Sequence, residues 1–105
     1  MLEITKDTFE QEVLESDSVV LADFWAPWCV PCKIMEPVLE QISSDHGQRV
    51  KVVKINVDNE PELAAKFSIV SIPSLLVFDR GEMKKMHVGA ASQPVLEAFL
   101  KDYLE

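Results

Sequence analysis

The hydrophobic positions along the chain follow two spacings, one typical of strands and one typical of helices. Apolar and β-branched runs with the length of strands occur at residues 19–25, 49–58, 74–78 and 83–88. The first run, VVLADFW, is apolar almost throughout, which is the pattern of a strand covered on both faces of its sheet. The last two runs flank the turn DRGE and therefore predict a β-hairpin.

Between these runs, apolar residues recur at the three- and four-residue spacing of amphipathic helices. The segment ITKDTFEQEVLES predicts a short strand and then a helix. Further helices are expected at about residues 30–46 and 61–67 and after Ser92, which can cap a final helix. The apolar face of the longest helix comprises Ile34, Met35, Val38, Leu39 and Ile42. Pro37 should kink this helix, because its ring clashes with the carbonyl of Lys33.

The predicted elements follow the order β-α-β-α-β-α-β-β-α, which indicates an α/β fold. Strands separated by helices pair in parallel, and the hairpin adds an antiparallel edge. We therefore expect a central mixed five-stranded sheet flanked by four helices. Because 105 residues suit one compact domain, residues 1–105 are predicted to form a single domain.

Composition and charge narrow the possible function classes. The formal net charge is −8, and an acidic surface repels nucleic acids and anionic membranes. No apolar run approaches the roughly 20 residues that span a bilayer. The start, MLEITKDTFE, has neither the basic nor the apolar region of a secretory signal. A cytoplasmic chain that binds neither nucleic acids nor membranes is the simplest interpretation, although a processed precursor would look the same.

The chain has two cysteines, Cys29 and Cys32, in the stretch WCVPC, where a predicted strand passes into a predicted helix. They could be inert thiols, a structural disulfide, a metal site or a redox centre. Two cysteines are too few for a structural zinc site with four ligands, unless two chains share the metal. A reducing cytosol discourages a purely structural disulfide. A CxxC motif at a strand-to-helix junction of a small α/β chain favours redox chemistry.

The position of the cysteine pair predicts its chemistry. Residues three apart are neighbours in a helical turn, so the two sulfurs can reach bonding distance. Free N–H groups and the helix dipole favour a thiolate there, and Lys33 adds a positive charge. Cys29 lies at the helix tip, where its sulfur can face solvent, and is predicted to attack substrates. Cys32 lies one turn further in, where its sulfur is more covered, and is predicted to resolve the mixed disulfide.

Motifs along essentially the whole chain resemble those of the thioredoxin family, whose active site usually reads WCGPC. They are DFWAPWCVPCK, Pro37, KINVD, IPSLLVF, Gly81 and VGA at 88–90. The resemblance implies the thioredoxin fold and a general protein-disulfide reductase that is monomeric and has no bound cofactor or metal. It also implies disulfide-containing proteins as substrates and a thioredoxin reductase, which uses NADPH and flavin, as the electron donor.

Four further titratable residues are candidates for a role in the site. Asp23 interrupts the run VVLADFW, and burial should raise the pKa of its carboxyl. We predict that it accepts the proton of Cys32, the role proposed for the matching acid of thioredoxins; in an edge strand it would instead lie in water. Lys54 matches a family lysine near that acid, although by pattern alone it suits the surface. His46 and His87 are predicted to be structural or exposed and not catalytic.

Substrate contact is expected from an apolar rim around the cysteines. Its predicted members are Trp28, Val30, Pro31, Val70, Ile72, Pro73, Val88, Gly89 and Ala90. The resemblance implies that a cis peptide bond precedes Pro73 and that this proline packs beside the cysteines. Because proline lacks an N–H and cannot join a ladder, the Ile72 backbone is then free to pair with an extended substrate. By pattern alone, Val70 and Val88 could equally be core residues.

The residue between the cysteines departs from the family, because Val30 stands where glycine is usual. A β-branched residue before a proline prefers extended backbone angles. Val30 should therefore relax less than glycine around Cys29. We expect it to change the redox potential by tens of mV at most.

The leading hypothesis is a dithiol carrier that reduces protein disulfides. An oxidase or isomerase is the second hypothesis; such family members often have His between the cysteines and lie outside the cytosol, and this chain has neither sign. A binding module without redox chemistry is the third. The intact CxxC motif, Asp23 and the proline loop argue against binding as the sole role.

Overall fold

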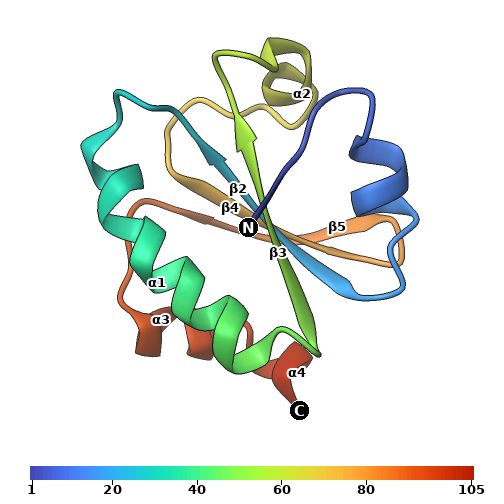
Figure 1. Cartoon of the computed structure of the whole chain (residues 1–105), viewed down its shortest axis with the longest axis vertical. Helices are drawn as coiled ribbons and strands as arrows, with labels where there is room; N and C mark the ends of the chain where they lie inside the picture. Colours follow the sequence, from blue (N-terminus) through green and yellow to red (C-terminus); the bar gives the residue numbers. More distant parts are fainter.

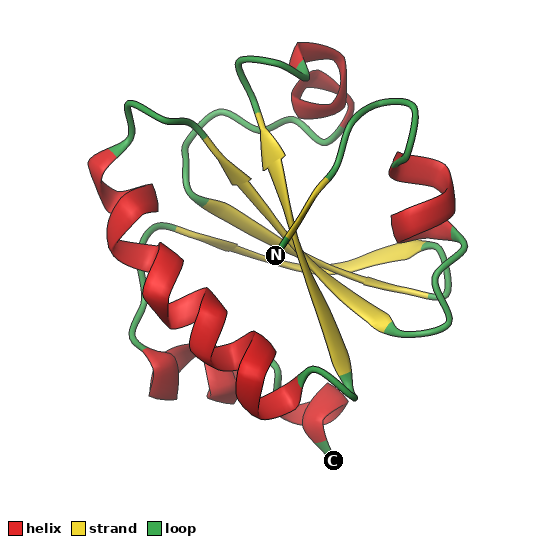
Figure 2. Ribbon diagram, in the orientation of Figure 1, coloured by secondary structure: helices red, strands yellow, loops and turns green.

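The computed structural model describes residues 1–105, in which five strands form one mixed sheet (Figures 1 and 2). The strands are β1 (Leu2–Glu3), β2 (Val19–Trp25), β3 (Val50–Asn56), β4 (Ser74–Asp79) and β5 (Glu82–Val88). Their order across the sheet is β1-β3-β2-β4-β5. Both β1 and β2 pair with β3 in parallel, whereas β4 is antiparallel to β2 and to β5. The predicted α/β fold with a mixed five-stranded sheet is therefore confirmed.

Helices cover both faces of the sheet, as Figure 1 shows. They are α1 (Val30–His46), α2 (Pro61–Lys66), α3 (Gln93–Phe99) and α4 (Lys101–Leu104), together with η1, a π-helical turn at Glu10–Leu14. The prediction of one continuous final helix is wrong, because the chain turns at Leu100, where ψ is 2°. Leu100 is fully buried, so this turn brings its side chain into the core between α3 and α4.

The sheet separates two apolar cores. One core lies on the side of η1 and α2 and includes Phe24, and the other lies on the side of α1 and α3 and includes Leu21 and Met35. Successive side chains of a strand point to opposite faces. Asp23, two residues after Leu21, therefore points to the side of α1, where the cysteines are.

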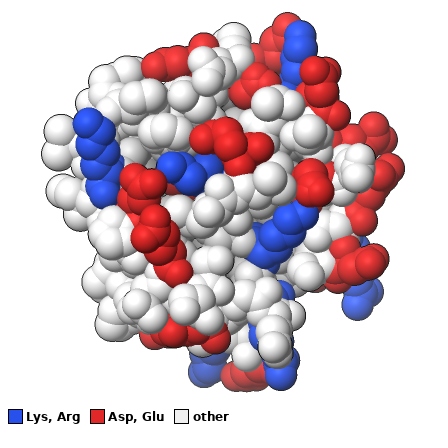
Figure 3. All heavy atoms as spheres, viewed as in Figure 1, with Lys and Arg blue, Asp and Glu red and all other residues white.

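Acidic side chains are spread over the face of the molecule seen in Figure 3, with basic side chains between them. This distribution agrees with the net charge of −8 and gives that face no continuous basic patch. No helix combines the length and the apolar character needed to cross a membrane.

Candidate active site

Cys29 and Cys32 lie where β2 passes into α1, and a disulfide joins them. Their Cα atoms are 5.2 Å apart. The Cys29 N–H donates to the Ala26 carbonyl at 3.1 Å, and the Cys29 carbonyl accepts from the Lys33 N–H at 3.2 Å, so a tight turn leads directly into the helix. Pro31 suits the first turn of α1 for two reasons. Its φ is already close to the helical value, and an N–H at this position would have no acceptor within the helix.

Cys29 is the N-cap residue of α1. Its Sγ accepts a hydrogen bond from the Cys32 N–H at 3.2 Å. After reduction, this N–H and the positive end of the helix dipole favour a thiolate on Cys29. The sequence predicted that Cys29 would be more exposed than Cys32, but both residues are only 4% exposed. Exposure of the whole residue therefore does not distinguish the attacking cysteine from the resolving one. The two cysteines differ instead in their positions relative to the N-terminus of α1.

Asp23 is a buried carboxyl in the central strand β2, so the alternative of an exposed edge strand is wrong. It is 2% exposed, and its Oδ1 has no hydrogen-bond partner. Burial raises the pKa of this carboxyl to about 7 against the opposing charge of Lys54, and the Glu3 and Glu36 carboxylates add to the increase. Lys54 is the partner of Asp23 in the register of β2 and β3. A carboxyl that titrates near neutral pH can both accept and return a proton.

The loop before β4 passes beside Cys29. The Ile72–Pro73 peptide bond is cis, as the resemblance implied, and the Ile72 carbonyl oxygen lies 3.8 Å from the Cys29 Sγ. Pro73 is buried, and its carbonyl accepts a hydrogen bond from the Gly89 N–H at 2.8 Å, which ties the segment after β5 to this loop. The Ile72 N–H has no hydrogen-bond partner within the chain. The loop therefore leaves backbone hydrogen-bonding capacity next to the disulfide.

Comparison with known proteins identifies the family of the chain. The family model described as Thioredoxin matches residues 1–102. The chain belongs to the thioredoxin family. It is 44% identical over 102 residues to Thioredoxin 1 of Nostoc sp., a match that covers 97% of this chain and 95% of that protein. It is 46% identical over 105 residues to the thioredoxin of Buchnera aphidicola subsp. Baizongia pistaciae, which covers 100% of this chain and 96% of that protein.

A third relative extends the comparison. The thioredoxin of Porphyra purpurea is 43% identical over 102 residues, covering 97% of this chain and 95% of that protein. Together with the disulfide at the start of α1, these matches identify the chain as a thiol-disulfide oxidoreductase. Its redox-active pair is Cys29 and Cys32.

Most apolar side chains of the predicted rim of this thioredoxin-family chain are exposed. Trp28 is 67% exposed, Val30 64%, Val70 94% and Val88 52%. Pro31 and Ala90 are also exposed, whereas Ile72 and Gly89 are half-buried. Gly89 has a φ of 98°, a conformation in which any side chain is strained. Val70 and Val88 are therefore surface residues, and the alternative that they belong to the core is wrong.

The sequence pattern did not predict the exposure or the contacts of several residues in this region. The helical spacing assigns Ile34 to the buried face of α1, but its side chain is 60% exposed one turn beyond Val30. The Trp28 indole N–H donates to the Asp58 carboxylate at 2.9 Å. The Lys54 ammonium donates to the Glu36 carboxylate at 3.2 Å. These partners lie far apart along the chain, so no local pattern links them.

Each histidine contacts a side chain away from the disulfide, although the buried His87 Nε2 has no hydrogen-bond partner. The His46 Nε2 is 2.8 Å from a Glu97 carboxylate oxygen, and His46 is the last residue of α1, whereas the cysteines are at its start. The His87 ring packs edge-on against Phe99, with 5.6 Å between the ring centres. Both contacts are consistent with structural roles.

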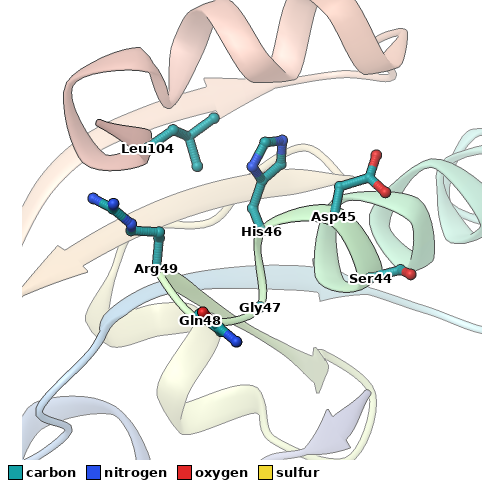
Figure 4. Close-up of a pocket in the computed structure, with 7 residues that line it drawn as sticks. All are labelled: Ser44, Asp45, His46, Gly47, Gln48, Arg49 and Leu104. Carbon is teal, nitrogen blue, oxygen red and sulfur yellow. The ribbon is translucent and has the colours of Figure 1, made fainter.

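The largest hollow on the molecule has a volume of about 480 Å³ and lies at the C-terminal end of α1 (Figure 4). It is lined by Ser44, Asp45, His46, Gly47, Gln48, Arg49 and Leu104. Ligand-type atoms of Asp45, His46 and Glu97 also lie within 4.8 Å of one another here. The Gln93 amide already bridges the two carboxylates, at 3.0 Å and 3.4 Å. Because neither cysteine lines this hollow, it is separate from the redox site.

Proposed function

We propose that the chain is a general reductase of protein disulfides in which Cys29 attacks and Cys32 resolves. The observation that carries this assignment is the hydrogen bond from the Cys32 N–H to the Cys29 Sγ at the N-cap of α1. An N–H at a helix start stabilises the thiolate, which is the attacking species. The Cys32 sulfur accepts no such hydrogen bond.

The exchange then has two steps. The Cys29 thiolate attacks one sulfur of the substrate disulfide, which forms a Cys29–substrate bond, breaks the substrate S–S bond and releases one substrate thiolate. Cys32 next gives its proton to the Asp23 carboxylate, and its thiolate attacks the Cys29 sulfur. The Cys29–Cys32 bond forms and the second substrate thiolate leaves. The substrate gains two electrons, and the dithiol of the chain loses two.

We propose that substrates bind beside the disulfide through both backbone and apolar contacts. The unpaired Ile72 N–H supports pairing with an extended substrate strand, and the nearby Ile72 carbonyl can accept the return hydrogen bond. The exposed Trp28, Val30 and Val88 side chains supply apolar contact. Backbone pairing and apolar contact depend little on substrate sequence, which is what a general reductase requires.

We also propose a cellular context, which membership of the family supports. The chain is recharged by a thioredoxin reductase that uses NADPH and flavin, and it works in the cytoplasm as a monomer, with residues 1–105 as one domain. The exchange itself requires no bound cofactor, because the two cysteine sulfurs carry both electrons.

Reduction of insulin tests the proposed function. With dithiothreitol as the electron source, the wild-type chain is expected to accelerate the reduction and precipitation of insulin, and Cys29→Ser is expected to reduce that acceleration to the uncatalysed rate. The physical reason is that serine cannot form the mixed disulfide. A wild-type chain that is inactive but still binds a partner would instead support a binding module.

The redox potential tests the effect of Val30, which is 64% exposed at the first residue of α1. Val30→Gly is expected to change the potential by about 10–30 mV, because glycine restores backbone freedom between the cysteines. Equilibration with glutathione buffers measures the potential of both proteins. Identical potentials would show that Val30 has no influence on the pair.

A further inference from the structure

Glu36, in the second turn of α1, contacts Lys54 on strand β3 of the sheet. Its carboxylate accepts a hydrogen bond from the Lys54 ammonium at 3.2 Å, and the ammonium lies 3.9 Å from the centre of the Trp25 ring. The Trp25 indole N–H donates to the Glu3 carboxylate at 3.2 Å. The Lys54 side chain is only 13% exposed and that of Glu36 46%, so solvent screens this ion pair only in part.

The buried Asp23 carboxyl lies next to this network but does not take part in it. Asp23 and Lys54 are register partners on adjacent parallel strands, so both side chains are on the same face of the sheet. Nevertheless the two form no ion pair, and the Asp23 Oδ1 has no hydrogen-bond partner. The lysine that could neutralise Asp23 is engaged by Glu36 and Trp25 instead.

We propose that Glu36 is a positioning residue for disulfide exchange, whose carboxylate holds the Lys54 ammonium over Trp25 and keeps it from pairing with the buried Asp23 carboxyl. This inference rests on the proposed role of Asp23 as the proton acceptor for Cys32. An Asp23 carboxylate paired with lysine would be a weaker base, because the ion pair stabilises its ionised form. By retaining Lys54, Glu36 keeps Asp23 basic enough to take a thiol proton.

The charged groups that face Asp23 come from three elements. Lys54 on β3 lowers the pKa of its carboxyl, whereas Glu3 on β1 and Glu36 on α1 raise it. The cysteine pair on α1 carries no charge while the disulfide is closed. Glu36 therefore acts on Asp23 in two ways with the same sign, directly through its negative charge and indirectly by holding Lys54.

The experiment is a carboxyl ¹³C NMR titration of Asp23 in the oxidised protein, in which the cysteines do not titrate. The isosteric change Glu36→Gln is expected to lower the pKa of Asp23 by about half a unit, as for one partly screened charge. Glu40→Gln is the matched control, because Glu40 is an exposed residue one turn later on the same helix. It is expected to leave the Asp23 titration unchanged, whereas Glu36→Asp, which retains the charge, should keep most of the wild-type value.

A double-mutant cycle separates positioning from the direct effect of charge. In a Lys54→Gln background, Glu36→Gln is expected to cause a clearly smaller shift, because there is no ammonium left to release. An equal shift in both backgrounds, no shift in Glu36→Gln, or the same shift in Glu40→Gln would overturn the positioning role.

Activity then distinguishes this inference from the proposed function on which it rests. The pH profile of insulin reduction by Glu36→Gln is expected to move to lower pH together with the Asp23 titration. If the titration moves and the profile does not, Asp23 is not the proton acceptor and Glu36 has no part in the exchange. If both move by the same amount, the two assignments stand together.

Discussion

Replacing Cys32 with serine is expected to trap protein substrates on Cys29 as mixed disulfides. The first step needs only the Cys29 thiolate, which the helix N-terminus stabilises through the Cys32 N–H, and a serine at position 32 retains that backbone N–H. The second step needs a thiol at position 32, so its loss stops the cycle after the first step. The Cys32→Ser protein is incubated with insulin whose disulfides are intact, and non-reducing electrophoresis measures the adduct. Dithiothreitol should release the bound insulin chain.

The matched variant is Cys29→Ser, which leaves the other cysteine as the only thiol. The two cysteines are equally buried, so accessibility of the whole residue favours neither variant. Any difference therefore reports the position of each sulfur relative to the helix start. We expect no appreciable adduct with Cys29→Ser. An adduct that forms with Cys29→Ser and not with Cys32→Ser would reverse the assigned roles.

Asp23→Asn is expected to stabilise the folded protein at neutral pH. Folding raises the pKa of the Asp23 carboxyl from 3.8 to about 7, mainly through burial. Between these two values the folded state holds a proton that the unfolded state has lost. The wild-type stability therefore falls as pH rises from about 4 to about 7 and is then constant. Three pKa units correspond to about 4 kcal/mol at most, and the neutral asparagine is free of this loss.

Urea unfolding of both oxidised proteins at several pH values measures the effect. The stability difference between Asp23→Asn and wild type should be small near pH 4 and should grow by several kcal/mol, up to about 4, near pH 8. Asp17→Asn is the control, because Asp17 is an exposed aspartate whose carboxyl makes no ion pair. A stability difference that does not change with pH would show that Asp23 does not titrate near neutrality. The stabilised variant should also exchange disulfides more slowly, since the proton acceptor is lost.

The sequence alone predicted most of the local structure of the site, because the relevant signals are short in range. The apolar run of β2, the CxxC spacing and the helix spacing of α1 each depend on residues close together along the chain. They predicted a cysteine pair at a strand-to-helix junction, and the structure has it there. The acid in the apolar run likewise identified Asp23 as a buried carboxyl with a raised pKa, because the residues on either side of it belong to the core.

Periodicity was less informative near the ends of helices. It assigned Ile34 to the core, whereas its side chain is 60% exposed near the start of α1. It also predicted one final helix, whereas the chain turns at Leu100 to bury that side chain. The local spacing does not show where a helix meets the rest of the fold, and at Leu100 packing in the core overrides it.

By itself, then, the sequence determined most of the elements, the family resemblance and the chemistry of the cysteine pair, because propensity, spacing and motif act over a few residues. Only the tertiary structure decided which distant side chains meet around that pair. The strand order β1-β3-β2-β4-β5 brings Lys54 beside Asp23, and the packing of α1 on the sheet brings Glu36 to Lys54. Such contacts depend on register and packing across the whole chain, and no single segment of the sequence carries that information.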